Sequence, residues 1–477
     1  MNAILFDNSV GWAQYKLLGG WKNLLATSIG YLVIGILVIY AMVKGLREAA
    51  QTVLTGMIFF FLVIQVIALL LYGTMRVGGA VRADVTAKLL ESHRLMPTPP
   101  ITAVLGYLFG SAAQALSFYL VTFVLGAVCV AGSGTRLQPW VFSNLVLLLF
   151  AVFVWMMVMF FSFRSGGAAL GFVIGMAFMV TSSGAPLALL PAINVLLSPM
   201  IGSTIFDMRT GMALDVGYLI AAIVQVLLIL IYLVASGRRY SRDDTLSFDA
   251  GLGLLLLAVW TAVSVLAIRR HSEFSWRPRG SIPWRYEEIA VVGSISSVLL
   301  LAILPVSSAL RAAALPPRKR IANRGWHIPP WLTVIAALAV ASLTILCVQP
   351  LLRQRYAELR TVIVATAFLV SARFMLGVAH RFKFGPRKFM IAWLFLTWLL
   401  PLVAETIRSA TIADEDESRH MSQIGMISPP GELYQIWTRN PWVHTDDFTG
   451  LAVQCLIAVG AASLYYSTQP RSTRATS

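Results

Sequence analysis

Long, continuously apolar runs dominate the sequence and restrict its possible folds more than any other feature. A membrane-crossing helix needs about 20 mostly apolar residues, and only helices and closed barrels satisfy their backbone groups inside a bilayer. The runs do not alternate between polar and apolar residues, which favours helices over barrel strands. The sequence therefore predicts an all-α, polytopic helical membrane protein with about twelve spans, six in each half, near residues 28–44, 53–73, 101–131, 141–163, 167–190, 216–236, 248–268, 289–310, 331–352, 361–380, 389–405 and 449–467.

The composition excludes the main alternatives to a membrane protein. Of the 477 residues, 58% are hydrophobic and only 12% are charged, whereas a soluble domain is usually about one quarter charged. A soluble enzyme and a disordered chain are both excluded on this ground. The net charge of +16 is expected to reflect Lys and Arg in inner loops, with anionic lipid as a secondary partner and no nucleic acid partner.

No cofactor or metal site is expected from the cysteine and histidine pattern. Cys129, Cys347 and Cys455 lie inside apolar stretches, and none of them forms a CxxC motif or has a His at zinc-site spacing. The first residues, which lack a basic segment ahead of an apolar core, also do not predict a cleavable signal peptide.

Charge counting favours an inner N-terminus for the first half. With that orientation the inner segments carry seven Lys or Arg residues (Lys16, Lys22, Arg76, Arg82, Lys88, Arg94 and Arg164) and the outer segments carry four (Lys44, Arg47, Arg136 and Arg209). The same rule does not decide the orientation of the second half, because keeping or omitting the span 248–268 gives the same numbers of inner and outer Lys and Arg residues.

Two domains are expected, 1–245 and 246–477. The first begins with an interfacial amphipathic helix over 11–26, in which Leu17, Trp21, Leu24 and Leu25 share one face. The second is a six-span domain with an acidic outer loop over 405–447. A double proline follows a basic loop in each half, at Pro99 and at Pro329, so the second domain is either a degenerate repeat of the first or similar to it by chance.

The loop 76–100 is the most distinctive stretch of the chain. Its Asp84 and Glu91 are the only acidic residues between Glu48 and Asp207. Asp84, Lys88 and Glu91 have the spacing i, i+4, i+7 and are expected to share one helical face, with Arg94 three residues after Glu91. Pro97 is expected to end this helix. Such a short charged helix between two spans suits docking onto a soluble protein, and the alternative is a solvated loop.

The string Thr86-Ala87-Lys88-Leu89-Leu90-Glu91-Ser92-His93-Arg94-Leu95-Met96-Pro97 resembles the cytoplasmic coupling segment of ABC transporter permeases of the type 2 (ABC-2) export class. The resemblance covers about residues 1–240 and includes the order of the spans. Val85 stands where that family often has Gly, and the second half carries no second copy of the string.

The resemblance implies a transport subunit of the cell (inner) membrane that is not itself an enzyme. ATP hydrolysis is then expected on a separate ABC-type ATP-binding subunit, because the chain has no phosphate-binding GxxxxGK loop followed by Ser or Thr. Asp84, Lys88, Glu91 and Arg94 are the residues implied to contact that ATPase. The substrate stays open, and so does the question of whether one chain, a homodimer or a second permease chain completes the pore.

The second half carries the residues of the alternative hypotheses. The loop 405–447 contains Asp414–Glu417, His420, Glu432, His444 and Asp446-Asp447, which could bind a divalent cation, support a membrane-embedded glycosyl- or acyltransferase, or form a solvated acidic loop. Arg373 lies within the apolar span 361–380 and has either a structural role or a role on a substrate pathway. A quinone-linked subunit is disfavoured by the lack of paired intramembrane histidines.

Overall fold

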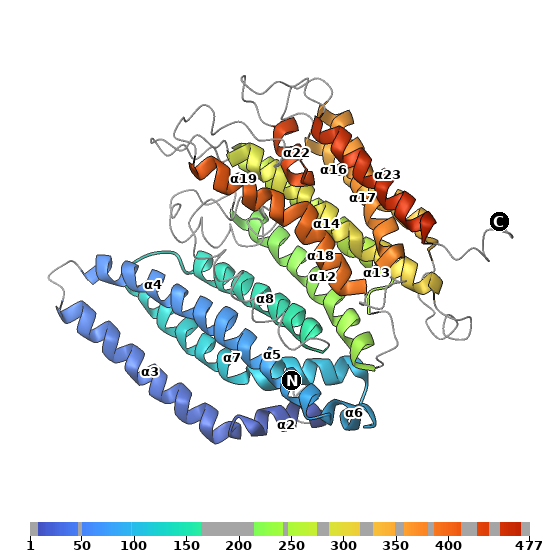
Figure 1. Ribbon diagram of the computed structural model, residues 1–477. Coiled ribbons are helices and arrows are strands. Elements are labelled where there is room, and N and C mark those ends of the chain that lie inside the picture. The colour runs from blue at the N-terminus through green and yellow to red at the C-terminus, as the bar shows by residue number, and fades with distance from the viewer. Residues whose placement is uncertain are drawn as a thin grey trace. The chain divides into compact units, whose positions relative to one another are not determined.

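The computed structural model (Figure 1) describes eleven stretches of the chain, and every structural statement below concerns them alone. The regular elements in these stretches are all helices, which confirms the all-α prediction. The chain divides into two compact units, one holding the described residues up to Ser247 and the other those from Phe248 on. The described stretches are 8–45, 50–96, 98–163, 214–241, 247–273, 286–314, 328–348, 357–379, 386–411, 427–437 and 449–468.

The first unit is a bundle of long helices with two short helices at one end. Figure 1 shows α3, α4, α7 and α8 running side by side, with α2 and α6 near the end where α7 begins. Its elements are α2 (Ser9–Leu17), α3 (Gly20–Gly45), α4 (Ala50–Val66), the π-helical segment η1 (Ile67–Gly73), α5 (Thr74–Thr86), α6 (Leu89–Arg94), α7 (Pro100–Gly132), α8 (Leu137–Ser162) and α12 (Leu214–Ser241).

The second unit has its own hydrophobic core, to which α14 and α17 contribute most. Phe368 lies at the centre of this core and stacks on Trp393, with ring centroids 5.7 Å apart. The elements are α13 (Ala250–Glu273), α14 (Tyr286–Ala314), α16 (Pro330–Val348), α17 (Ala357–Ala379), α18 (Pro386–Leu394), the π-helical segment η3 (Phe395–Leu399), α19 (Leu400–Thr411), α22 (Pro429–Trp437) and α23 (Thr449–Ser467).

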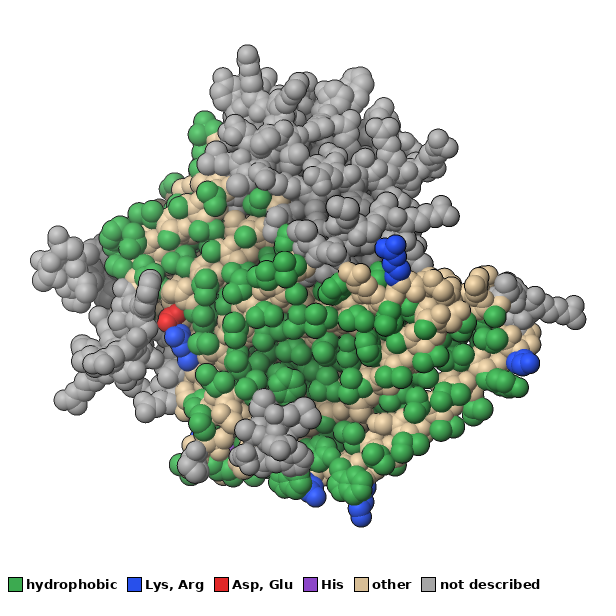
Figure 2. All heavy atoms as spheres, turned by 180° about the vertical axis from the view of Figure 1, so that it is seen from behind, with side chains coloured by type: hydrophobic (Ala, Val, Ile, Leu, Met, Phe, Trp, Pro, Cys, Tyr) green, Lys and Arg blue, Asp and Glu red, His purple; other side chains and the backbone are tan. Residues whose placement is uncertain are grey.

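Apolar side chains cover the outside of the helices as well as their packed sides. Eight helices of the described part are long and apolar enough to cross a membrane, and three shorter apolar helices accompany them. On the face drawn in Figure 2 the described side chains are mostly hydrophobic, with Lys and Arg mainly at its borders. Such a surface suits lipid rather than water, and it identifies a multi-pass membrane protein. The predicted span 167–190 lies outside the described residues.

Two predicted boundaries in the first unit are wrong. The span expected over 53–73 continues without a break through α4, η1 and α5 to Thr86, because nothing after Gly73 stops the helix where the apolar run ends. The single helix expected over 11–26 is broken, since Gly19 and Gly20 adopt positive φ angles of 88° and 64°. Trp21, Leu24 and Leu25 therefore belong to the first long helix, α3, and only the part up to Leu17 forms the short helix α2.

The π-helical segment η1 lies against a buried tryptophan of α8. The indole Nε1 of Trp155 donates a hydrogen bond to the carbonyl oxygen of Leu69, at 2.9 Å. A Cβ on Gly73 would lie 2.6 Å from the Trp155 ring. The wider π-helical turn leaves a carbonyl oxygen available that would accept an intrahelical hydrogen bond in a regular helix. Together with the close contact at Gly73, the Trp155 hydrogen bond sets the rotation of α5 relative to α4 about the helix axis.

Helix α2 lies unusually close to α7 because two glycines line the contact. Gly106 and Gly110 are one turn apart on α7, and such pairs let helix backbones approach each other. A Cβ on Gly110 would lie 2.6 Å from the carbonyl oxygen of Gly11 in α2. Asn8 caps α2 by accepting from the amides of Val10 and Gly11, and its amide donates to the carbonyl of Thr102.

We expect Gly110→Ala to displace α2 and to lower the free energy of unfolding by about 1–3 kcal/mol. The obstructing atoms belong to the Gly11 backbone, which cannot rotate away. Gly79→Ala in α5 is the matched control, because no atom lies within 4 Å of its Cβ position and alanine favours a helix. Thermal unfolding of the detergent-purified chain checks the pair, and equal midpoints would contradict the close contact.

Candidate functional site

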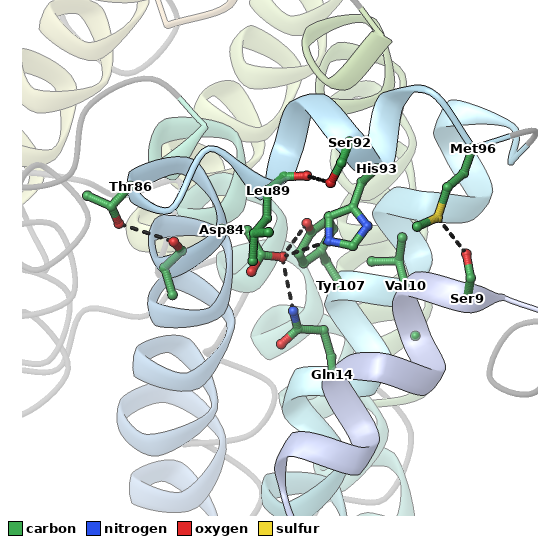
Figure 3. Close-up of polar contacts among 12 residues, drawn as sticks. Ser9, Val10, Gln14, Asp84, Thr86, Leu89, Ser92, His93, Met96 and Tyr107 are labelled. Carbon is green, nitrogen blue, oxygen red and sulfur yellow. Dashed lines mark hydrogen bonds and ion pairs between the residues drawn. The ribbon is translucent and has the colours of Figure 1, made fainter.

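Asp84 is the centre of a buried polar cluster at one end of the first unit. The residue is 6% exposed and lies in the last turn of α5. Its Oδ2 accepts hydrogen bonds from the Tyr107 hydroxyl at 2.6 Å and from Gln14 Nε2 at 3.1 Å. His93 Nε2 lies 3.6 Å from the same oxygen. Figure 3 shows Gln14, His93 and Tyr107 pointing toward Asp84.

The four residues of this cluster come from four different helices. Gln14 lies on α2, Asp84 on α5, His93 on α6 and Tyr107 on α7. Hydrogen bonds to an ionised carboxylate are stronger than neutral ones, and a buried site strengthens them further. Asp84 of α5 therefore joins α2 to α7 by its two hydrogen bonds, and it lies beside His93 of α6.

The helical face expected for Asp84, Lys88 and Glu91 does not exist. Helix α5 ends at Thr86, and Lys88 takes the left-handed conformation, with φ 58°. A left-handed residue just after the last turn is a common way to end a helix. The chain then restarts as the six-residue helix α6. As a result Asp84 points into the unit, whereas Lys88 and Glu91 are exposed.

Arg94 fixes the other side of α6 to the end of α12. Its Nε donates to the carbonyl oxygen of Tyr240 at 2.6 Å, and its Nη2 donates to that of Arg239 at 3.3 Å. A cation at a helix C-terminus satisfies free carbonyls and the negative end of the helix dipole. Arg94 is half-buried, so it contributes to holding α6 in place rather than to its exposed surface.

Aromatic rings close the cluster from the side of α8 and α12. Tyr107, Phe163 and Tyr240 pack against one another, with ring centroids 6.1–6.5 Å apart. The His93 ring meets Tyr107 edge to face at 6.4 Å. These apolar contacts keep water away from the Asp84 hydrogen bonds, and the lower local dielectric strengthens them.

The outer surface of α6 and the residues after it combine apolar and charged side chains. Leu95 is 88% exposed and Leu89 48% exposed, beside the exposed charges of Lys88 and Glu91. Exposed apolar side chains rimmed by charge are typical of a protein contact. Of the four predicted contact residues, Lys88 and Glu91 are therefore accessible, whereas Asp84 is buried and Arg94 half-buried. Their contact with an ATPase stays a prediction.

In the second unit, Arg373 is half-buried among aromatic rings. Its guanidinium carbon lies 5.0 Å from the ring centre of Phe374 and 5.9 Å from that of Tyr465 on α23. Cation–π contacts of this kind stabilise a desolvated arginine. Within the described stretches no ion pair involves Arg373, and its role on a substrate pathway stays a prediction.

Glu432, from the predicted acidic loop 405–447, is not solvated. It has no exposed surface, and its Oε1 lies 2.9 Å from Nη2 of Arg360, which is 5% exposed. The solvated-loop expectation is wrong for this residue because α22, which carries it, packs against α14 and α17. The other acidic and histidine residues of the loop lie outside the described residues, except Glu405, which pairs with Arg408. The transferase alternative stays a prediction.

Several residues that the structure brings together could not be identified from the sequence. Gln14, Tyr107 and Arg360 sit inside or beside apolar runs without a motif around them. The one available signal was the rarity of acidic residues in the first half, which did single out Asp84. In the described ranges, no group of three or more His, Cys, Asp or Glu residues could hold a metal ion.

Comparison of the chain with protein-family models, with curated proteins and with solved structures found no match.

Proposed function

We propose that this chain is the transmembrane permease subunit of an ATP-driven ABC exporter of the type 2 class, which moves its substrate outward. The observation that supports the proposal most is that α6 is exposed on one side and held to other helices on the other. This short helix and its two flanking residues expose Lys88, Glu91 and Leu95. Arg94 bonds α6 to α12, and His93 of α6 lies 3.6 Å from Asp84, whose hydrogen bond with Tyr107 joins α5 to α7. A soluble ATPase that pushes on α6 would therefore move three long helices together.

The charge distribution supports placing this end of the first unit at the cytoplasmic side. Lys and Arg collect on inner segments. The described residues at the end with α2 and α6 include more cations than the opposite end, where α3 and α7 finish. The first group is Lys16, Lys22, Arg82, Lys88, Arg94, Arg238 and Arg239, and the second is Lys44 and Arg136.

The proposal includes twelve spans, six in each half, in the cell (inner) membrane. The described helices support an even number of crossings in the first half. The ends of α8 and α12 meet, since Arg239 Nη1 donates to the carbonyl of Phe160 at 2.6 Å, so α12 begins at the opposite end from Ser162. One membrane crossing between the end of α8 and the start of α12 meets this requirement, and the sequence predicts a span at 167–190. Helix α2 is the interfacial helix of the proposal.

We expect Lys88→Glu combined with Glu91→Lys to reduce transport-linked ATP hydrolysis at least tenfold, because the charges of the contact are reversed and like-charge contacts are strongly unfavourable. Both side chains are exposed, so the stability of the chain is expected to stay within about 0.5 kcal/mol of the parent. The measurement is ATPase activity of the complex purified from native membranes in mild detergent.

Arg136→Glu is the matched control, because Arg136 is exposed at the opposite end of the unit and should leave the activity unchanged. Purification of the parent chain without any ATP-hydrolysing subunit would refute the proposed function. Full activity in the charge-reversed variant would refute the assignment of α6 as the contact.

A further inference from the structure

The outward side of α2 and the start of α3 form a surface that combines aromatic, apolar and basic side chains. We call it the cationic face and define it by Trp12, Lys16, Leu17, Trp21 and Lys22. Leu17 is 77% exposed, Trp21 60% and Trp12 39%, and both lysines are exposed. No acidic residue occurs between positions 9 and 45, so nothing on these two helices neutralises the lysines.

Lys16 lies over the junction between the two helices. Its Nζ is 4.6 Å from the ring centre of Trp12 and 4.0 Å from the Cβ position of Gly20, where α3 begins. Tryptophan prefers the boundary between hydrocarbon and water, and lysine there extends its ammonium group toward the head groups. The face thus has the chemistry of a membrane surface.

The course of α3 places the cationic face at that surface. Only 6% of the apolar window of α3 is buried within the protein, and Ile29, Val33 and Leu37 are among its exposed side chains. A helix so exposed and so apolar needs lipid around it. Lys22 in its first turn and Lys16 at the end of α2 therefore lie at the boundary between the hydrocarbon and the head groups.

We propose that the cationic face binds anionic phospholipid head groups and that this binding is relayed to α6 through Gln14 and Asp84. Positive charge near an anionic leaflet adds about fivefold in affinity for each lysine, so the two lysines together contribute about 25-fold. The opposite side of α2 carries the relay: Val10 and Gly11 pack on α7, and Gln14 donates to Asp84. A lipid that steadies α2 steadies the carboxylate beside His93 of α6.

The test uses the full chain in nanodiscs of phosphatidylcholine alone or mixed with phosphatidylglycerol. Hydrogen exchange is followed at the backbone amides of residues 9–17 and 89–95. For the parent chain, phosphatidylglycerol is expected to slow exchange severalfold in both segments. Lys16→Gln combined with Lys22→Gln should abolish both effects, whereas Lys44→Gln at the far end of α3 should keep them.

Gln14→Leu distinguishes lipid binding at α2 from the transmission of its effect to α6. This variant keeps both lysines, so phosphatidylglycerol should still slow exchange in residues 9–17, but it should no longer affect residues 89–95. Equal exchange of α2 in the two lipids, or an undiminished effect in the double lysine variant, would overturn the lipid site. An undiminished effect on α6 in Gln14→Leu would overturn the relay. Neither outcome depends on an ATPase, so the proposed function is tested separately.

Discussion

Replacing Arg360 by methionine is expected to lower the free energy of unfolding by about 3–5 kcal/mol, because it leaves a buried carboxylate without its cation. Glu432 has no exposed surface, and Arg360 approaches its Oε1 to 2.9 Å. Water cannot reach Glu432 to replace the lost partner. The change also releases α22, whose nine residues are held between α14 and α17 by this pair and by apolar contacts of Leu433 and Ile436.

The double variant Arg360→Met and Glu432→Met distinguishes a lost charge balance from lost packing. Removing both members of a buried ion pair is often neutral or stabilising, so the second substitution should recover most of the loss. Arg408→Met is the comparison, because the Arg408 side chain is 27% exposed and pairs with Glu405 on its own helix. Water reaches this pair more readily than the Arg360 pair, so the loss of stability should be smaller.

Thermal unfolding of the purified chain, followed by tryptophan fluorescence, measures all three variants. If Arg360→Met unfolds at the same temperature as Arg408→Met, Glu432 is neutral in the folded protein and the pair contributes no charge balance. If the double variant is as unstable as the single one, the side chains contribute by packing.

Helix ends could be predicted from the sequence wherever an apolar run ends at a residue that stops a helix. The span predicted over 101–131 is α7, from Pro100 to Gly132, because proline suits the first turn and Gly134, with φ 74°, follows the helix end. The last span, 449–467, coincides with α23. Where no such residue follows, the prediction failed: α5 carries Arg76 and Arg82 and still continues the helix to Thr86, since charge alone does not stop a helix.

The candidate site could be predicted only in part, for a physical reason. Asp84 stands out as a rare acidic residue in an apolar half, and Lys88 and Glu91 follow it at helical spacing. That spacing assumes an unbroken helix, which the left-handed Lys88 prevents. The partners of Asp84 at positions 14 and 107 come from distant helices, and no local pattern encodes a contact made by tertiary packing.

Replacing Asp84 by alanine is expected to lower the free energy of unfolding by about 3–5 kcal/mol, since hydrogen bonds to a charged group contribute about 1.5–3 kcal/mol each. The Tyr107 hydroxyl and the Gln14 amide both lose their acceptor in a site that is closed to water. Asp84→Asn keeps one acceptor oxygen and should cost roughly half as much. Glu91→Ala is the control, because Glu91 is exposed on α6 and surface changes stay within about 0.5 kcal/mol.

The effect of Asp84→Ala on α6 distinguishes a local role of Asp84 from a general loss of stability. Without Asp84, the Arg94 hydrogen bonds, the buried Leu90 and the ring contact of His93 with Tyr107 still hold α6, but the carboxylate beside His93 is lost. The amides of α6 should therefore exchange hydrogen at least tenfold faster well below the unfolding temperature. The amides of α7 beneath it should keep their protection, because its own hydrogen bonds remain. Unchanged exchange in α6 of the Asp84→Ala chain would mean that Arg94 and the packing of α6 position the helix without Asp84. The mechanical connection from α6 into the bundle would then run through α12 and not through α5 and α7.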